Sequence, residues 1–137
     1  MKKVFNIAII FSVLALLAGI YSRELPKFTS YDGPSALGTI HTHLFVLGAL
    51  FPLLFGFWTT YSGKTIKDIG WSWVGYFIGV IVTIGLMLLR GTFEVLGTSL
   101  SRGADASISG IAGLGHAVLG ISLIVLLFKL RSFVRAE

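Results

Sequence analysis

The three histidines of this chain are its strongest candidates for chemistry. His41 and His43 are separated by a single residue, and His116 lies much further along the chain. All three fall in apolar stretches, where an ionisable or metal-binding side chain is costly and generally has a function. An imidazole in such a place can bind a metal ion, ligate a haem iron or hydrogen-bond to another helix. We therefore expect any chemistry of the chain to centre on these residues.

Four apolar segments must position the histidines, and each is long enough to cross a hydrocarbon core of about 30 Å as a helix. They comprise residues 4–22, 38–61, 71–90 and 108–130. Mean hydropathy over the 137 residues is +0.89, with 55% hydrophobic and 12% charged residues. No alternating pattern of a membrane barrel is present. The sequence predicts one all-α domain over residues 1–137, an integral membrane four-helix bundle.

Basic residues predict the orientation of this bundle, because cytoplasmic flanks collect Lys and Arg. With both termini inside, the inner flanks hold Lys2, Lys3, Lys64, Lys67, Lys129, Arg131 and Arg135. The outer flanks then hold Arg23, Lys27, Arg90 and Arg102. We expect a multi-pass protein of the bacterial cytoplasmic membrane whose net charge of +5 reflects topology and contact with lipid, not nucleic acid. The first segment lacks a small-residue cleavage site and is expected to remain as a helix.

Local signals predict where the helices end and bend. The expected connections are residues 23–37, 62–70 and 99–107, the last being small, polar and turn-like. Pro52 cannot donate to the carbonyl of Gly48, so a kink is expected near the middle of the second segment. Trp71, Trp73 and Tyr76 are expected to form an aromatic belt at the inner interface.

The histidine pair has a geometry that limits what it can bind. At 100° per residue, the side chains of His41 and His43 point about 200° apart around one helix. The two therefore suit two sites, or one site and one structural hydrogen bond, better than a single metal ion. His116 shares its side of the fourth segment with Gly113 and Gly120.

Haem b is the cofactor that best suits this set of residues. It needs axial imidazoles, apolar walls, glycines that leave room for the ring and basic groups for its propionates. The residues expected to contact it are His41, His43, His116, Phe45, Gly113, Gly120 and Arg90. His116 would ligate the iron together with either His41 or His43, and that choice stays open. Arg90 is the first choice for a propionate, although a snorkelling role or a pair with Glu94 would also explain it.

Other functions fit the same histidines. Three imidazoles also suit Cu or Zn, which would make the chain a metal-binding or transport protein. Interhelical hydrogen bonds would make it a packing or interaction protein without a cofactor. With haem, the expected role is electron transfer or the handling or sensing of a small gas. Whether the chain is an enzyme, and what its redox partner is, are left open.

Two resemblances extend this interpretation. Residues 38–45 (GTIHTHLF) and 110–116 (GIAGLGH) resemble the motifs of a family of uncharacterised four-helix bacterial membrane proteins. The His-Thr-His motif is also similar, more distantly, to one four-helix arc of the haem-copper oxidase catalytic subunit. There a His-x-His pair directs its imidazoles to different haems, which implies that His43 matches the low-spin haem ligand and His41 the opposite face.

The oxidase resemblance also bears on assembly. Three such arcs form the oxidase subunit, which implies a homo-oligomer here, a trimer narrowly over a dimer. Because His41 and His43 face opposite ways, one of them should meet a neighbouring copy. The adjacent histidine pair that holds copper, and the His-Pro-Glu motif, are missing from the sequence. The resemblance therefore implies haem binding and assembly, and argues against oxygen reduction.

Overall fold

The computed structural model describes residues 1–133, and within that range every regular element is a helix. Its elements are α1 (Lys2–Thr29), η1 (Ala36–Thr39), α2 (Ile40–His43), η2 (Leu44–Leu50), α3 (Phe51–Tyr61), α4 (Ile66–Ile69), α5 (Trp71–Val95) and α6 (Arg102–Phe133). The run from η1 to α3 forms one continuous helical segment. Arg135, counted above among the inner basic residues, lies outside the described residues.

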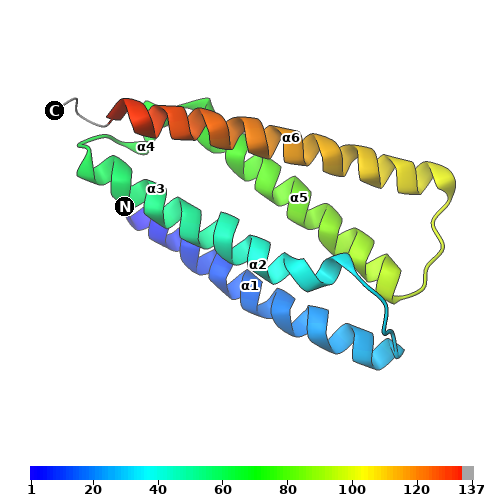
Figure 1. Cartoon of the computed structure of the whole chain (residues 1–137). Coiled ribbons are helices and arrows are strands. Elements are labelled where there is room, and N and C mark those ends of the chain that lie inside the picture. The colour runs from blue at the N-terminus through cyan, green and yellow to red at the C-terminus, as the bar shows by residue number, and fades with distance from the viewer. Residues whose placement is uncertain (134–137) are drawn as a thin grey trace.

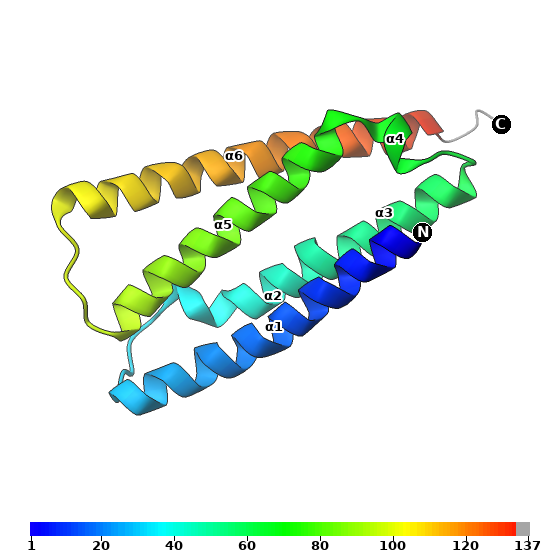
Figure 2. The same ribbon diagram turned by 180° about the vertical axis from the view of Figure 1, so that it is seen from behind.

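Four helical segments have the length and apolar composition to cross a membrane: α1, the segment from η1 to α3, α5 and α6. The four predicted apolar segments are thus present as helices. The segments form two antiparallel pairs, with α1 along α2–α3 and α5 along α6 (Figures 1 and 2). α5 also packs on η1, so it joins the pairs, while α1 and α6 lie at the two edges.

The helices are longer than the sequence predicts, and two expected connections are partly wrong. α1 continues through Pro26 to Thr29, and Ser30 then ends it in the left-handed conformation, with φ 53°. The side chain of Lys27 also contacts Glu24 at 2.8 Å, one turn earlier. α6 begins at Arg102, inside the stretch expected to be a turn. Polar residues outside the apolar core can continue a helix wherever its backbone hydrogen bonds stay satisfied, so hydropathy alone underestimates helix length.

The predicted distortion near Pro52 takes the form of a π-helix over residues 44–50. The N–H of Phe51 bonds to the carbonyl of Val46, five residues earlier. The next bond of that pattern would join Pro52 to the carbonyl of Leu47, but proline has no N–H to donate. The hydroxyl of Tyr76 on α5 donates to that carbonyl instead, at 2.8 Å. A side chain from a neighbouring helix thus completes the hydrogen bonding that proline interrupts.

An aromatic cluster joins the two helix pairs near the end of the molecule where α4 lies. Trp73 stacks on Phe55 with ring centroids 5.2 Å apart, and Tyr76 lies 4.8 Å from Phe51. Trp73 and Tyr76 are buried, whereas Trp71 is 66% exposed. The expected aromatic belt is therefore wrong for Trp73 and Tyr76, because their side of α5 faces α3 instead of the surroundings.

Candidate functional site

His43 lies at the end of α2 and is half-buried. Its Nδ1 lies 2.8 Å from the carbonyl oxygen of Thr39, one turn earlier. A carbonyl oxygen can only accept, so Nδ1 carries the proton and the lone pair of the neutral ring is on Nε2. Metal-bound histidines commonly use such a bond to fix the tautomer and the orientation of the ring. His43 is thus arranged to offer Nε2 as a ligand atom.

His116 repeats this arrangement on α6. Its Nδ1 lies 2.9 Å from the carbonyl oxygen of Ala112, again one turn earlier, and its side chain is exposed. Added Cβ atoms at Gly113 and Gly120 would meet nothing within 4 Å. The side of α6 that carries His116 and these glycines thus has room for a further group, whereas Gly115 and Leu119 face α5.

His41 differs from the other two histidines. It faces α1, where an added Cβ at Gly19 would lie 3.8 Å from the Cβ of His41. Its Nδ1 is buried and has no hydrogen-bond partner among residues 1–133, and its Nε2 lies 3.4 Å from the hydroxyl of Thr42. His41 and His43 thus have different contacts, which agrees with the opposed directions that helix geometry predicts for their side chains. Only His43 and His116 have the carbonyl bond that leaves Nε2 available.

The small and aromatic residues near His41 mainly serve helix packing. Gly48 is buried against α1, and an added Cβ there would lie 2.0 Å from Cδ1 of Phe11. Phe45 is 38% exposed, which leaves part of its ring on the outside of the second segment. The structure therefore places Phe45 where it can contact a group outside the chain, and Gly48 where it lets two helices approach.

The histidines do not converge within one chain. α6 packs on α5 and, near its own C-terminal end, on α3, whereas α2 packs on α1, η1 and α5. α5 thus lies between the helices of His43 and His116 (Figure 1). Within the described part of the chain, no three side chains of His, Cys, Asp or Glu lie close enough to hold a bare metal ion.

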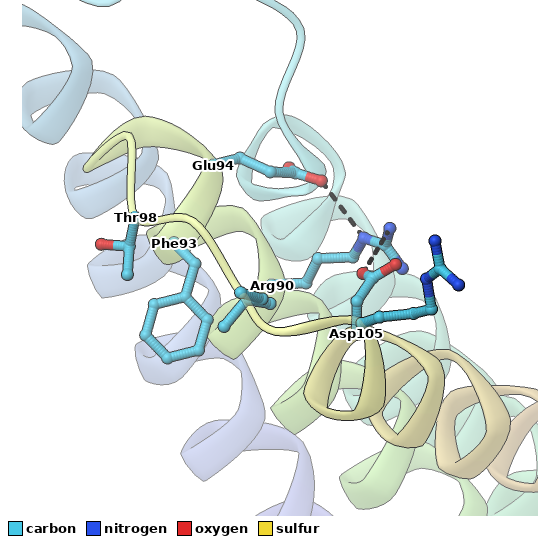
Figure 3. A pocket seen from close by; sticks show the side chains of 7 residues that line it. Arg90, Phe93, Glu94, Thr98 and Asp105 are labelled. Carbon is cyan, nitrogen blue, oxygen red and sulfur yellow. Dashed lines mark hydrogen bonds and ion pairs between the residues drawn. The ribbon is translucent and has the colours of Figure 1, made fainter.

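Arg90 is the centre of an ionic cluster at the end of the molecule away from α4. Its guanidinium group lies 3.3 Å from Oε1 of Glu94 and 3.2 Å from Oδ1 of Asp105 (Figure 3). It also donates to the hydroxyl of Ser109 at 2.8 Å. Glu94 also accepts from the backbone N–H of Ala36 at 2.8 Å. The cluster links α5, α6 and the start of η1, and a cavity of about 390 Å³ lies beside it.

The pair between Arg90 and Glu94, which was the alternative to a propionate contact, is present, but sequence reasoning missed Asp105. Asp105 lies in the first helical turn of α6, within residues 99–107, which the sequence predicts to be a connection between helices. An acidic residue in the first turn of a helix is a common favourable feature, and this signal could have moved the predicted helix start.

The chain matches one family model over nearly its whole length. A family model described as "Protein of unknown function (DUF2871)" matches residues 1–133. The chain belongs to this family. Neither the curated proteins nor the solved structures include a match. The predicted membership of a four-helix membrane protein family is supported at the level of DUF2871, whereas the similarity to haem-copper oxidases stays a prediction.

Proposed function

We propose that this DUF2871 protein binds haem b through His43 and His116 and transfers electrons in the membrane. The observation that carries the proposal is the bond from each Nδ1 to a backbone carbonyl, which leaves each Nε2 free to ligate. Haem supplies one-electron redox chemistry, and its axial ligands and surroundings set the potential. Two axial imidazoles leave no open position on the iron, which favours electron transfer. Gas handling or sensing is the alternative if only one of them ligates.

The arrangement of donors suits haem better than a bare Cu or Zn ion. A bare ion needs three or four protein ligands gathered at one point. In haem the porphyrin supplies the equatorial ligands, so one or two imidazoles are enough. Gly113 and Gly120 beside His116 would leave space for the flat ring, and Phe45 would add an apolar wall.

We further propose that the haem lies between copies of the chain. α5 separates α2 from α6, so His43 and His116 are directed to a shared cofactor most simply when they come from different copies. The uncovered side of α6 at His116 gives a neighbouring copy room to approach. A closed homo-oligomer follows from repeating one such contact, and the three-arc similarity favours a trimer over a dimer. Native mass spectrometry in mild detergent tests this, and a monomer that retains haem would contradict the shared site.

Arg90 remains the proposed partner of a haem propionate, together with Arg102. Arg102 lines the cavity beside Arg90 and forms no ion pair within residues 1–133. Because Glu94 and Asp105 already balance the charge of Arg90, a propionate would have to share its guanidinium group with them. A substitution of Arg90 should therefore weaken haem retention, and one of Arg102 should have the smaller effect, because Arg102 begins α6 about 21 Å along the helix from His116.

Histidine variants test the ligand assignment. His43→Ala and His116→Ala should each lose the haem or shift its Soret band, because an axial bond is removed. His41→Ala is the matched control, since it deletes an imidazole from the same helix and should keep the wild-type spectrum. Circular dichroism of each variant verifies that the helices are intact. Loss of the spectrum in the His41 variant with retention in the His43 variant would contradict the assignment.

A further inference from the structure

A second cavity, remote from the histidines, lies near the N-terminal end of α1. Its volume is about 640 Å³, and residues of α1, α3, α4 and α5 line it. Figure 2 shows the N-terminus close to the end of α3 and to α4. Its apolar lining consists of Ile7, which is partly exposed, and of the buried residues Val4, Gly56 and Trp73. Ile7 and Gly56 lie further from the helix ends than the N-terminus and α4 do, so this part of the apolar lining is on the side towards the middle of the helices.

The same cavity is lined by three lysines, Lys3, Lys64 and Lys67. None of them forms an ion pair within the described part of the chain. Asp68 does not line the cavity, and it accepts hydrogen bonds from the backbone N–H and the hydroxyl of Thr65, at 2.7 and 2.9 Å. Those bonds lower the pKa of Asp68, so it stays charged at neutral pH. Three positive charges against one negative charge leave the mouth of the cavity cationic.

The depth of the cavity indicates the chemistry of its ligand. Tyr61 and Trp71 are 86% and 66% exposed at this end of the molecule, and exposed Tyr and Trp side chains mark the level of lipid headgroups. A cationic mouth at that level meets phosphate groups, and an apolar wall below it meets acyl chains. A free inorganic anion would gain no binding energy from the apolar part of the lining.

We propose that this cavity binds one anionic glycerophospholipid, with its phosphate between Lys3, Lys64 and Lys67 and the start of an acyl chain against Ile7. Basic pockets between helices at the membrane surface are a common form of lipid recognition. The bound lipid would link the beginning of α1 to the turn between α3 and α5. This proposal is independent of haem.

Native mass spectrometry of the full chain tests this proposal. The probes are phosphatidylglycerol and phosphatidylcholine with identical acyl chains, each added to the protein in mild detergent. The wild type should retain phosphatidylglycerol in preference. The double variant Lys64→Gln, Lys67→Gln should weaken that binding by about fivefold for each lysine removed, which corresponds to ~1 kcal/mol per cation near an anionic surface. Lys2→Gln is the matched control, because it removes the same charge outside the cavity and should leave binding unchanged.

Several results would overturn the proposal. Equal retention of the two lipids, or unchanged binding by the double variant, would show that the lysines do not recognise a headgroup. Inorganic phosphate, added as a separate probe, should neither displace phosphatidylglycerol nor raise the melting temperature as that lipid does. An equal effect of phosphate alone would identify a site for soluble anions and exclude the lipid.

Discussion

Replacing Tyr76 by Phe should destabilise the fold by about 1–1.7 kcal/mol. The change removes the hydroxyl that donates to the carbonyl of Leu47. Pro52 has no N–H to replace it, so this carbonyl is left without a hydrogen-bond donor. A buried acceptor without a partner costs about 1–3 kcal/mol, while hydrogen bonds between membrane helices average about 0.6 and reach about 1.7 kcal/mol. The expected loss of unfolding free energy is the range that these two estimates share. The phenyl ring keeps the contact with Phe51, whose centroid is 4.8 Å away, so packing contributes little.

Reversible unfolding in mixed micelles measures this difference, with Tyr61→Phe as the control. Tyr61 is 86% exposed, and loss of its hydroxyl should leave the unfolding free energy unchanged. Infrared spectroscopy with an isotope-labelled carbonyl at Leu47 adds a local readout, because the band should move to higher frequency when the donor is lost. Equal stabilities of the two variants, together with an unshifted carbonyl band, would refute the role given to Tyr76.

Two further predictions concern helix packing and charge. Gly79→Ala should lower the unfolding free energy by about 1–3 kcal/mol, because the new Cβ would lie 2.6 Å from the backbone nitrogen of Leu119. Gly85→Ala is the control and should not lower it, because a Cβ there would meet nothing within 4 Å. Thermal unfolding of both variants compares them, and equal melting temperatures would count against close packing at Gly79. Arg90→Gln should lower stability by up to about 1 kcal/mol by leaving Asp105 unpaired, and the loss should shrink in high salt. A loss that does not respond to salt in melting experiments would argue against an ionic role.

The predicted spans and the observed helices agree in the apolar interior of each segment. The interior of each segment is apolar and long, and a segment of that composition in a hydrocarbon environment has to be a helix. Their ends differ because polar residues such as Arg102 and Lys27 continue a helix although they lower the local hydropathy. The π-helix around Leu47 could be expected as a distortion from Pro52, but not in its form. That form depends on Tyr76, which lies on another helix.

The candidate site was predictable to a similar degree. The side of α6 shared by His116, Gly113 and Gly120 follows from helical periodicity. The carbonyl bonds of His43 and His116 each span one helical turn, but periodicity alone does not predict them, because Nδ1 of His41 makes no such bond. The choice between His41 and His43 could not be made from the sequence. It depends on which side of α2 packs against Gly19, and that is a property of the tertiary arrangement.

The central claim is that this protein holds haem b, and the absorption spectrum of the purified chain tests it most directly. Protein expressed with sufficient haem and purified in mild detergent should show a Soret band, and its pyridine haemochrome should be of b type. Reduction should produce the sharp visible bands of iron with two axial imidazoles. A colourless preparation that contains stoichiometric Cu or Zn, or no metal at all, would contradict the account.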